Sequence, residues 1–317
     1  MRATIARAAG HISVRYYFLP CLLLCVNAFA APTQVPGTRV AMDVPASFTL
    51  APDFPGFVSS GVQATIAVSE LPSSFIDATE TYDDLGLKRN GIDVVARETF
   101  EHEGLRAILI DGEQIIRERR VAKLILLTGD VTESLMITAT YFKKDEGKIA
   151  AQLRETLRQA VWDPSEPLDH YGGLDFRLKE IPGLRVATRA SNSIIFTEEG
   201  RLPDRFYTGA MLVVGWSTGD TSTVKNKRRF AHSQFANIQL LNRGEIENTE
   251  FLQVDDQEAI EVTGSGRHKH LGYDINAYQL IVVYDDRYLM AQGFANGNDA
   301  EVHFDLFRTI MNSLSTE

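Results

Sequence analysis

Cysteine is almost missing from this sequence, and long apolar runs are missing after its first thirty residues. The only two cysteines, Cys21 and Cys25, both lie within those thirty residues. A chain that loses them has no disulfide and no cysteine ligand for a metal. No later segment approaches the roughly 20 apolar residues that a transmembrane helix needs. We therefore expect a soluble protein that folds without covalent crosslinks.

The first thirty residues have the pattern of a secretory signal peptide. Residues 1–17 carry arginines and no acid, residues 18–30 are apolar, and the segment ends in Ala28-Phe29-Ala30. A basic start, a short apolar stretch and small residues at the cleavage positions are typical of exported proteins. We expect cleavage after Ala30 and a periplasmic or secreted protein. Lipid attachment at Cys25 stays open, although Leu24 is larger than the residue that lipidation prefers.

Basic charge is also scarce in this chain. Its 32 lysines and arginines are outnumbered by 42 aspartates and glutamates, which gives a net charge of −10. An acidic surface is repelled by nucleic-acid phosphates and by anionic lipids. We therefore expect neither nucleic acid nor a membrane span, and we expect a protein partner. The hydrophobic content of 44% supplies a core, and the length suits two domains.

Motifs that bind cofactors or metals are absent from the sequence. It contains no phosphate-binding glycine loop, no EF-hand loop and no H-E-x-x-H zinc motif. No pair of acids has a spacing that would justify a catalytic dyad. We therefore expect no cofactor and no metal.

The chain resembles itself in its two halves. Val35-Pro36-Gly37-Thr38-Arg39-Val40-Ala41 is similar to Ile181-Pro182-Gly183-Leu184-Arg185-Val186-Ala187. Leu135-Met136 and Leu153-Arg154 recur in the same order as Leu289-Met290 and Phe307-Arg308. Ordered matches at nearly constant spacing indicate an internal repeat. We predict a signal peptide at 1–30, a first domain at 31–162, a linker at 163–179 and a second domain at 180–317.

Each predicted domain has the same order of elements. In the first, a helix is expected over 72–90, four strands over 92–101, 105–118, 121–128 and 134–142, and an amphipathic helix over 146–162. In the second, an early strand over 209–217 is followed by a helix over 227–242. Strands over 250–254, 259–264, 273–284 and 288–295 precede a last helix that Asp299 caps. Gly129-Asp130 and Asp285-Asp286 are expected at tight turns between strands. Strands in a run predict an antiparallel sheet.

The closing segment "LILLTGDVTESLMITATYFKKDEGKIAAQLRETLRQAV" combines a hairpin of long strands with one amphipathic helix. This order resembles the PsbP-like family, which includes the photosystem subunit PsbP, Mog-type Ran-binding proteins and DcrB-type envelope proteins. The resemblance implies an α+β fold of two tandem antiparallel-sheet domains, with helices packed on the sheet faces as an α/β/α sandwich. It also implies docking or assembly work without a shared catalytic residue.

Ser217 lies in Gly215-Trp216-Ser217-Thr218-Gly219, which has the G-x-S-x-G pattern of a nucleophile elbow. An elbow needs a helix directly after the serine, but residues 219–227 are rich in loop-forming residues. Acids and histidines such as Asp274 and His303 follow, in an order that chance supplies easily. An exported serine hydrolase that uses Ser217 is therefore an alternative and not the leading hypothesis.

Two histidines suggest a second alternative. His268 and His270 alternate along a predicted strand, so both rings would point to one face. No third ligand has a diagnostic spacing, and two imidazoles alone make a weak metal site. A carrier of a small ligand or a metal, using these histidines or the cleft between the domains, stays open as an alternative.

A dense basic cluster stands out in this acidic chain. It contains Lys225, Lys227, Arg228 and Arg229 at the start of a predicted helix, where cations oppose the helix dipole. We interpret this cluster either as a solvated helix start or as a docking surface for an acidic partner or lipid headgroups. A second basic segment, Arg117 to Arg120, is interpreted as a surface strand or a docking edge. The expected function is a non-enzymatic binding or assembly factor of the bacterial cell envelope, whose partner is an envelope protein or complex.

Overall fold

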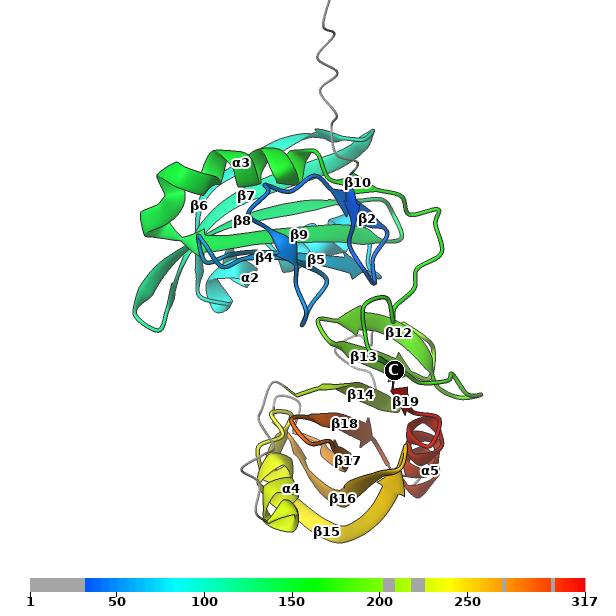
Figure 1. Cartoon of the computed structure of the whole chain (residues 1–317). Coiled ribbons are helices and arrows are strands. Elements are labelled where there is room, and N and C mark those ends of the chain that lie inside the picture. The colour runs from blue at the N-terminus through cyan, green and yellow to red at the C-terminus, as the bar shows by residue number, and fades with distance from the viewer. Residues whose placement is uncertain (1–31, 202–208, 218–225, 270–271, 298–299, 317) are drawn as a thin grey trace, which may run out of the picture. The chain divides into compact units, whose positions relative to one another are not determined.

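Two large antiparallel sheets contain most of the strands that the structure describes (Figure 1). The computed structural model describes residues 32–201, 209–217, 226–269, 272–297 and 300–316. Each sheet has seven strands, and one lies in each half of the chain. We call residues 32–165 the N-terminal half and residues 166–316 the C-terminal half. The two predicted antiparallel sheets are confirmed, whereas the predicted domain boundaries stay a prediction.

The sheet of the N-terminal half has the order β3-β4-β5-β9-β8-β7-β6. Its four long strands match the four that alternation and turn residues predict, and their ends differ from the predicted ends by at most two residues. The predicted hairpin at Gly129-Asp130 is confirmed, since Gly129 pairs with Ser134 across a short loop. The strands are β3 (Thr49–Leu50), β4 (Gly56–Ser59), β5 (Ala64–Leu71), β6 (Ile92–His102), β7 (Leu105–Ile116), β8 (Arg119–Gly129) and β9 (Ser134–Phe142).

The sheet of the C-terminal half has the order β12-β13-β14-β18-β17-β16-β15. Its turns use residues that tolerate a left-handed backbone, as in the Asp255-Asp256 turn, where φ is 51° and 57°. The strands are β12 (Arg185–Ala190), β13 (Ser193–Thr197), β14 (Met211–Trp216), β15 (Leu241–Val254), β16 (Gln257–His268), β17 (Asp274–Val283) and β18 (Tyr288–Ala295).

The two sheets share one topology. In both, the first three strands lie side by side in sequence order, and the third pairs with the last strand of the sheet. The remaining strands then follow in reverse sequence order to the other edge. The similar heptapeptides do not occupy equivalent places, however. Val40 lies on β2 (Val40–Met42), outside the large sheet, whereas Val186 lies on β12 at its edge. Both peptides form a tight Pro-Gly turn, so their likeness reflects the turn and not the strand that follows.

Two small sheets lie beside the large ones. In the N-terminal half, β2 pairs with β1 (Thr33–Gln34) and with β10 (Val161–Trp162). In the C-terminal half, β11 (Phe176–Arg177) pairs with β19 (Ser315–Thr316). Leu174, Phe176 and Leu178 are buried in the C-terminal core, which therefore begins inside the segment predicted to be a linker.

The predicted α/β/α sandwich, with helices packed on the sheet faces, is wrong. Of the residues that the structure describes, 49% lie in strands and 19% in helices. The α-helices that the structure describes have 6 to 13 residues, whereas the longest strand has 14. A helix rises about 1.5 Å per residue and a strand about 3.3 Å, so these helices are too short to form layers over seven strands. They are α1 (Phe75–Thr81), α2 (Asp84–Arg89), α3 (Glu146–Arg158), α4 (Lys227–Ala236) and α5 (Ala300–Met311), with a 3-10 turn at Lys143–Asp145.

Local capping explains where the helices begin. The single helix expected over 72–90 is two helices, because Ser74 accepts a hydrogen bond from the Asp77 amide and Asp83 accepts one from the Gly86 amide. The predicted cap Asp299 lies outside the described residues. Asn226 caps α4 by accepting from the Arg229 amide.

Each half has its own hydrophobic core. Helix α3 buries Ile149, Leu153 and Leu157 against the N-terminal sheet, as their helical spacing predicts. Helix α5 buries Phe304 and Phe307 in the same way in the C-terminal half. Shorter helices cover part of the opposite face of each sheet. The partial cover leaves the end of the N-terminal sheet open.

Candidate docking surfaces

The hairpin of β7 and β8 carries exposed apolar and basic side chains at its tip. Ile115 is 70% exposed and Ile116 is 42% exposed, although both belong to a long strand. They lie next to Arg117, which the turn also exposes. Exposed isoleucines cost solvation free energy, and their grouping with charges is typical of a binding surface. We define the hairpin surface as Ile115, Ile116, Arg117, Arg119, Arg120, Val121, Phe142 and Lys144.

The turn of this hairpin has a strained backbone. Ile116 pairs with Arg119, so Arg117 and Glu118 form a two-residue turn with φ of 46° and 66°. Such a turn favours Asn-Gly, because a side chain with a Cβ is strained at positive φ. Strain of this kind is found where a side chain is needed for another purpose. The turn therefore holds Arg117 in a place where stability alone would favour a smaller residue.

The hairpin surface lies beyond the reach of the small helices. Val121 and Lys123 share a sheet face with Ile125, because alternate residues of a strand point the same way. Helices α1 and α2 cover this face around Ile125, and their cluster does not extend to Val121. The uncovered part holds a cavity of about 440 Å³, which is within the range of small binding pockets. It is lined by Gln63, Ile116, Arg117, Arg119, Val121, Thr140, Tyr141 and Phe142.

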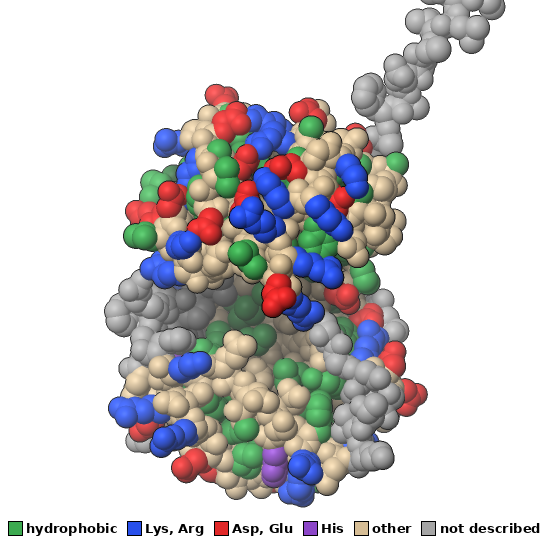
Figure 2. Space-filling model, turned by 90° about the vertical axis from the view of Figure 1, so that its left-hand side faces the viewer, with side chains coloured by type: hydrophobic (Ala, Val, Ile, Leu, Met, Phe, Trp, Pro, Cys, Tyr) green, Lys and Arg blue, Asp and Glu red, His purple; other side chains and the backbone are tan. Residues whose placement is uncertain are grey.

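Phe142 anchors the basic side chains of the hairpin surface. The guanidinium of Arg119 lies 5.5 Å from the centre of its ring, and Nζ of Lys144 lies 5.6 Å from it. Cation–π contacts of this kind hold a cation in place while its hydrogen-bond donors stay available. In Figure 2 the end of the N-terminal half that carries this hairpin faces the viewer, and many Lys and Arg side chains lie there among hydrophobic and acidic ones.

Lys123 lies on the sheet beside this cavity and is partly buried. Its Nζ donates to the Thr140 hydroxyl at 3.3 Å, and burial lowers its pKa from 10.5. A folded-state pKa below the unfolded value means that the folded chain releases this proton first as pH rises. The penalty for burying the ammonium is therefore present at neutral pH and is relieved as pH rises toward 10.5.

We expect Lys123→Met to stabilise the N-terminal half at neutral pH. Removing the buried charge should raise the free energy of unfolding by about 0.5–2 kcal/mol, the range of single stabilising changes. The gain should shrink as the pH is raised. The measurement is urea unfolding of the variant and its parent at several pH values, followed by Trp162 fluorescence in a Trp216→Phe background. A constant difference at every pH would contradict the assignment of the effect to the ammonium.

The predicted basic cluster at the start of α4 is divided in the structure. Lys227 forms an ion pair with Glu258 at 2.5 Å, and the guanidinium of Arg228 lies 5.0 Å from the ring centre of Phe251. Arg229 is exposed, and Lys225 lies outside the described residues. The internal ion pair offsets part of the charge, so this cluster is a weaker candidate than the hairpin surface. Its role in docking stays a prediction.

Ser217 follows strand β14 in an antiparallel setting. The neighbours of β14 are β13 and β18, and both run antiparallel to it, whereas a nucleophile elbow follows a parallel strand. The Ser217 amide donates to the Tyr288 carbonyl at 2.9 Å, which continues the strand pairing. This setting favours the interpretation of Ser217 as the end of a strand. Residues 218–225, where an elbow helix would begin, lie outside the described residues.

The histidine pair gives no metal site that the structure describes. His268 ends β16, and its ring lies 5.1 Å from that of Tyr273, while His270 lies outside the described residues. His303 on α5 contacts Glu198 at 3.1 Å and does not join them. Within the described ranges no three ligand-type side chains come together. A metal carrier therefore gains no support.

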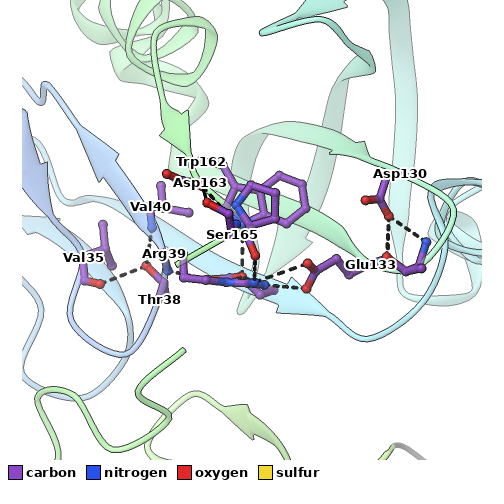
Figure 3. A network of polar contacts seen from close by, with 12 residues as sticks. Val35, Thr38, Arg39, Val40, Asp130, Glu133, Trp162, Asp163 and Ser165 are labelled. Atoms are coloured by element: carbon purple, nitrogen blue, oxygen red, sulfur yellow. Dashed lines mark hydrogen bonds and ion pairs between the residues drawn. The ribbon is translucent and has the colours of Figure 1, made fainter. Parts of the chain in front are cut away.

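A buried ion network holds the N-terminal strand to its sheet (Figure 3). Arg39 contacts Glu70 and Glu133, each at 2.5 Å, and its side chain is only 9% exposed. Trp162 donates from Nε1 to Glu70 at 3.0 Å and packs beside the guanidinium. The carboxylates raise the pKa of Arg39 and oppose its desolvation, so the charge stays in place. The N–H donors of Arg39 and Trp162 face acceptors within the fold, and the role of this network is therefore structural.

A second ion pair recurs in both halves. Arg154 on α3 donates to Asp111 on β7 at 2.6 Å, and Arg308 on α5 donates to Glu261 on β16 at 2.8 Å. Strands β7 and β16 have the same place in their sheets, and the two arginines belong to the matched Leu153-Arg154 and Phe307-Arg308. The pair therefore fastens the closing helix to the same strand in each half.

No protein family model matches the chain, and no curated protein matches it in sequence. Similar solved structures include PA94 of Pseudomonas aeruginosa, a protein of unknown function. It has 14% identity and a TM-score of 0.32 over 45% of this chain and 97% of that one. The immunity protein TplEi of the T6SS of Pseudomonas aeruginosa has 13% identity and a TM-score of 0.33, and the match covers 92% of this chain and 98% of that one. The Tle4-Tli4 complex has 14% identity and a TM-score of 0.33, and the match covers 88% of this chain and 98% of that one.

Likeness at these TM-scores carries no argument about function. The predicted PsbP-like family is not shown, although a tandem, sheet-rich fold of two parts is present. None of the helices in the described part of the chain is both long and apolar enough to cross a membrane.

Proposed function

We propose that this chain is an exported, non-enzymatic factor that binds another protein of the cell envelope through the hairpin surface. The carrying observation is that the exposed Ile116 and two basic side chains, Arg117 and Arg119, line one cavity on the uncovered end of a sheet. Grouped Ile, Phe and Arg side chains are typical of the centre of a protein interface. Release of residues 1–30 as a signal peptide and membership of the PsbP-like family belong to this proposal.

The rest of the chain supports binding more than catalysis. Buried charged groups such as Arg39 and Glu261 are already paired within the fold and face no open site. Ser217 directly follows a strand whose neighbours run antiparallel to it, which is not the setting that an elbow nucleophile requires. The hairpin surface, by contrast, keeps apolar area in water, which is costly unless a partner covers it. Protein binding therefore accounts for the feature that folding alone leaves unexplained.

We expect that changing the hairpin surface will abolish capture of the partner in cells. The chain is produced with its own leader and a C-terminal tag, cells are crosslinked, and captured proteins are identified. Ile116→Asp combined with Arg119→Glu should reduce the yield of a specific partner at least about tenfold, because interface hot spots combine apolar and Arg contacts. Both positions are exposed, so the fold should tolerate the changes.

Matched controls separate this surface from other exposed positions. Ile76→Asp changes an isoleucine that is 65% exposed on α1, and Arg228→Glu with Arg229→Glu reverses charge at the start of α4. Capture should survive both. Loss of the partner only in the α4 variant would move the docking site to the predicted basic cluster. A captured partner that is toxic without this chain would make the chain an immunity protein, the class of TplEi.

A further inference from the structure

The basic side chains of the hairpin surface are not neutralised within the fold. Arg117, Arg119, Arg120 and Lys144 form no ion pair with any residue that the structure describes. Their neighbour Lys143 is different, because it contacts Glu113 at 3.0 Å and Glu146 at 2.7 Å. Uncompensated cations on a chain of net charge −10 make a local positive field on an otherwise acidic molecule.

Apolar surface lies within this positive field. Ile116, Val121 and Phe142 line the cavity of about 440 Å³ together with Arg117 and Arg119. A second hollow is lined by Arg119, Arg120, Phe142, Lys143 and Lys144, so the two share Arg119 and Phe142. One side chain in the cavity would contact the apolar groups that line it and would lie beside the cations that line it. The ligand must therefore combine an apolar group with negative charge nearby.

We infer that the hairpin surface binds an acidic protein segment that places one apolar side chain in the cavity between Ile116 and Phe142. This rests on the proposed function and names the chemistry of the partner. Three of the four uncompensated cations are arginines, whose planar donors pair with carboxylates in a bidentate way. An anionic membrane is the weaker occupant, because its extended surface would also meet the acidic remainder of the chain, whereas a short segment meets only the local positive field.

The test uses a fluorescein-labelled synthetic peptide in which Leu and Phe are flanked by Asp and Glu on both sides. Anisotropy is measured with the whole chain from Ala31 to Glu317. Control peptides replace Leu and Phe by Ser, or replace the acids by Lys. The acidic apolar peptide should bind at least about tenfold more tightly than either control, because both charge and burial contribute. Added salt should weaken its binding.

Two variants of the chain locate the contact. Arg119→Glu with Arg120→Glu should lower the affinity for the peptide by about tenfold or more, since attraction becomes repulsion. Arg228→Glu with Arg229→Glu makes the same net charge change on α4, a helix of the other half, and should leave the affinity unchanged. Equal loss in both variants would show a general effect of charge and would overturn the inference.

The other outcomes decide between this inference and the proposed function. If no acidic peptide binds while capture in cells still depends on Ile116 and Arg119, the partner chemistry is wrong and the proposed function stands. If the Ser control peptide binds equally well, the cavity anchors no side chain and the inference fails. If phosphatidylglycerol vesicles bind through Arg119 and the peptide does not, the occupant is a membrane and the inference is overturned.

Discussion

Replacing Arg308 by methionine is expected to destabilise the C-terminal half by about 3–5 kcal/mol, the usual cost of removing one partner from a buried ion pair. The side chain of Glu261 is only 5% exposed, and Arg308 is its partner at 2.8 Å. The variant would leave this carboxylate in a core that also contains Tyr278, whose pKa burial and Glu261 raise. An uncompensated charge in such a place is far more costly than the ion pair is favourable.

The two tryptophans allow each half to be followed separately. Trp216 lies in the C-terminal half and Trp162 in the N-terminal half, and the sequence has no others. Urea unfolding of Arg308→Met is therefore measured by Trp216 fluorescence in a Trp162→Phe background. The slope of the transition must stay constant for the free energies to be compared.

The equivalent pair in the N-terminal half is the matched control for Arg308→Met. The side chains of Arg154 and Asp111 are 35% and 29% exposed, so water can solvate Asp111 after its partner is removed. Arg154→Met should cost only about 1 kcal/mol, as partly exposed pairs do. Replacing Glu261 together with Arg308 by apolar residues should recover most of the loss. Equal losses in the two single variants would contradict the argument from burial.

Local signals predicted much of each sheet. The Gly129-Asp130 loop and the Asp285-Asp286 turn are confirmed, because turn residues between alternating apolar strands act within a few positions. The spacing of Ile149, Leu153 and Leu157 predicted the buried face of α3 for the same reason. The repeat of Leu153-Arg154 as Phe307-Arg308 also found residues that have one role in both halves. These features depend on short-range patterns that a sequence displays directly.

Features that depend on distant partners were missed. Strand β15 was expected to begin only at Glu250, because its first part, including Arg243 and Glu247, is polar on both sides. An edge strand exposed on both faces has no alternation to read, and its pairing with β16 alone makes it a strand. The heptapeptides around Arg39 and Arg185 were similar through their turns, while their strands joined different sheets. The sandwich prediction is wrong because the pattern of a helix in the sequence does not indicate how much of a sheet that helix covers.

The candidate site was only partly visible for a similar reason. The sequence shows basic clusters, but it does not show which cations are neutralised in the fold. Lys227 meets Glu258 across 31 positions, whereas Arg117 and Arg119 meet no acid in the described chain. The exposure of Ile116 also follows from where α1 and α2 end on the sheet. Their capping residues were the signal that could have found it, because Ser74 and Asp83 shorten the cover.

Replacing Arg39 by methionine is expected to cost the N-terminal half about 3–5 kcal/mol, because two carboxylates lose their common partner. The side chain of Glu70 is 7% exposed and keeps only the Trp162 indole as a neighbouring donor besides the backbone amide of residue 39. Because Trp162 belongs to β10, which pairs with β2, loss of the network should also release the end of this half. Urea unfolding in a Trp216→Phe background reports on it through Trp162 itself.

The two carboxylates differ in exposure, and this difference makes the Arg39 prediction decisive. Glu133 is 29% exposed, so Glu133→Gln should cost no more than about 1 kcal/mol, as for a partly exposed pair. Glu70→Gln leaves Arg39 paired with Glu133, so its cost should lie between those of Glu133→Gln and Arg39→Met. Hydrogen exchange should show the earliest loss of protection at β2 and β10, because the network fastens them to the large sheet. Uniform loss of protection across the whole sheet would instead place Arg39 in the central core. If Arg39→Met costs no more than Glu133→Gln, water reaches Glu70 and the argument from burial is wrong.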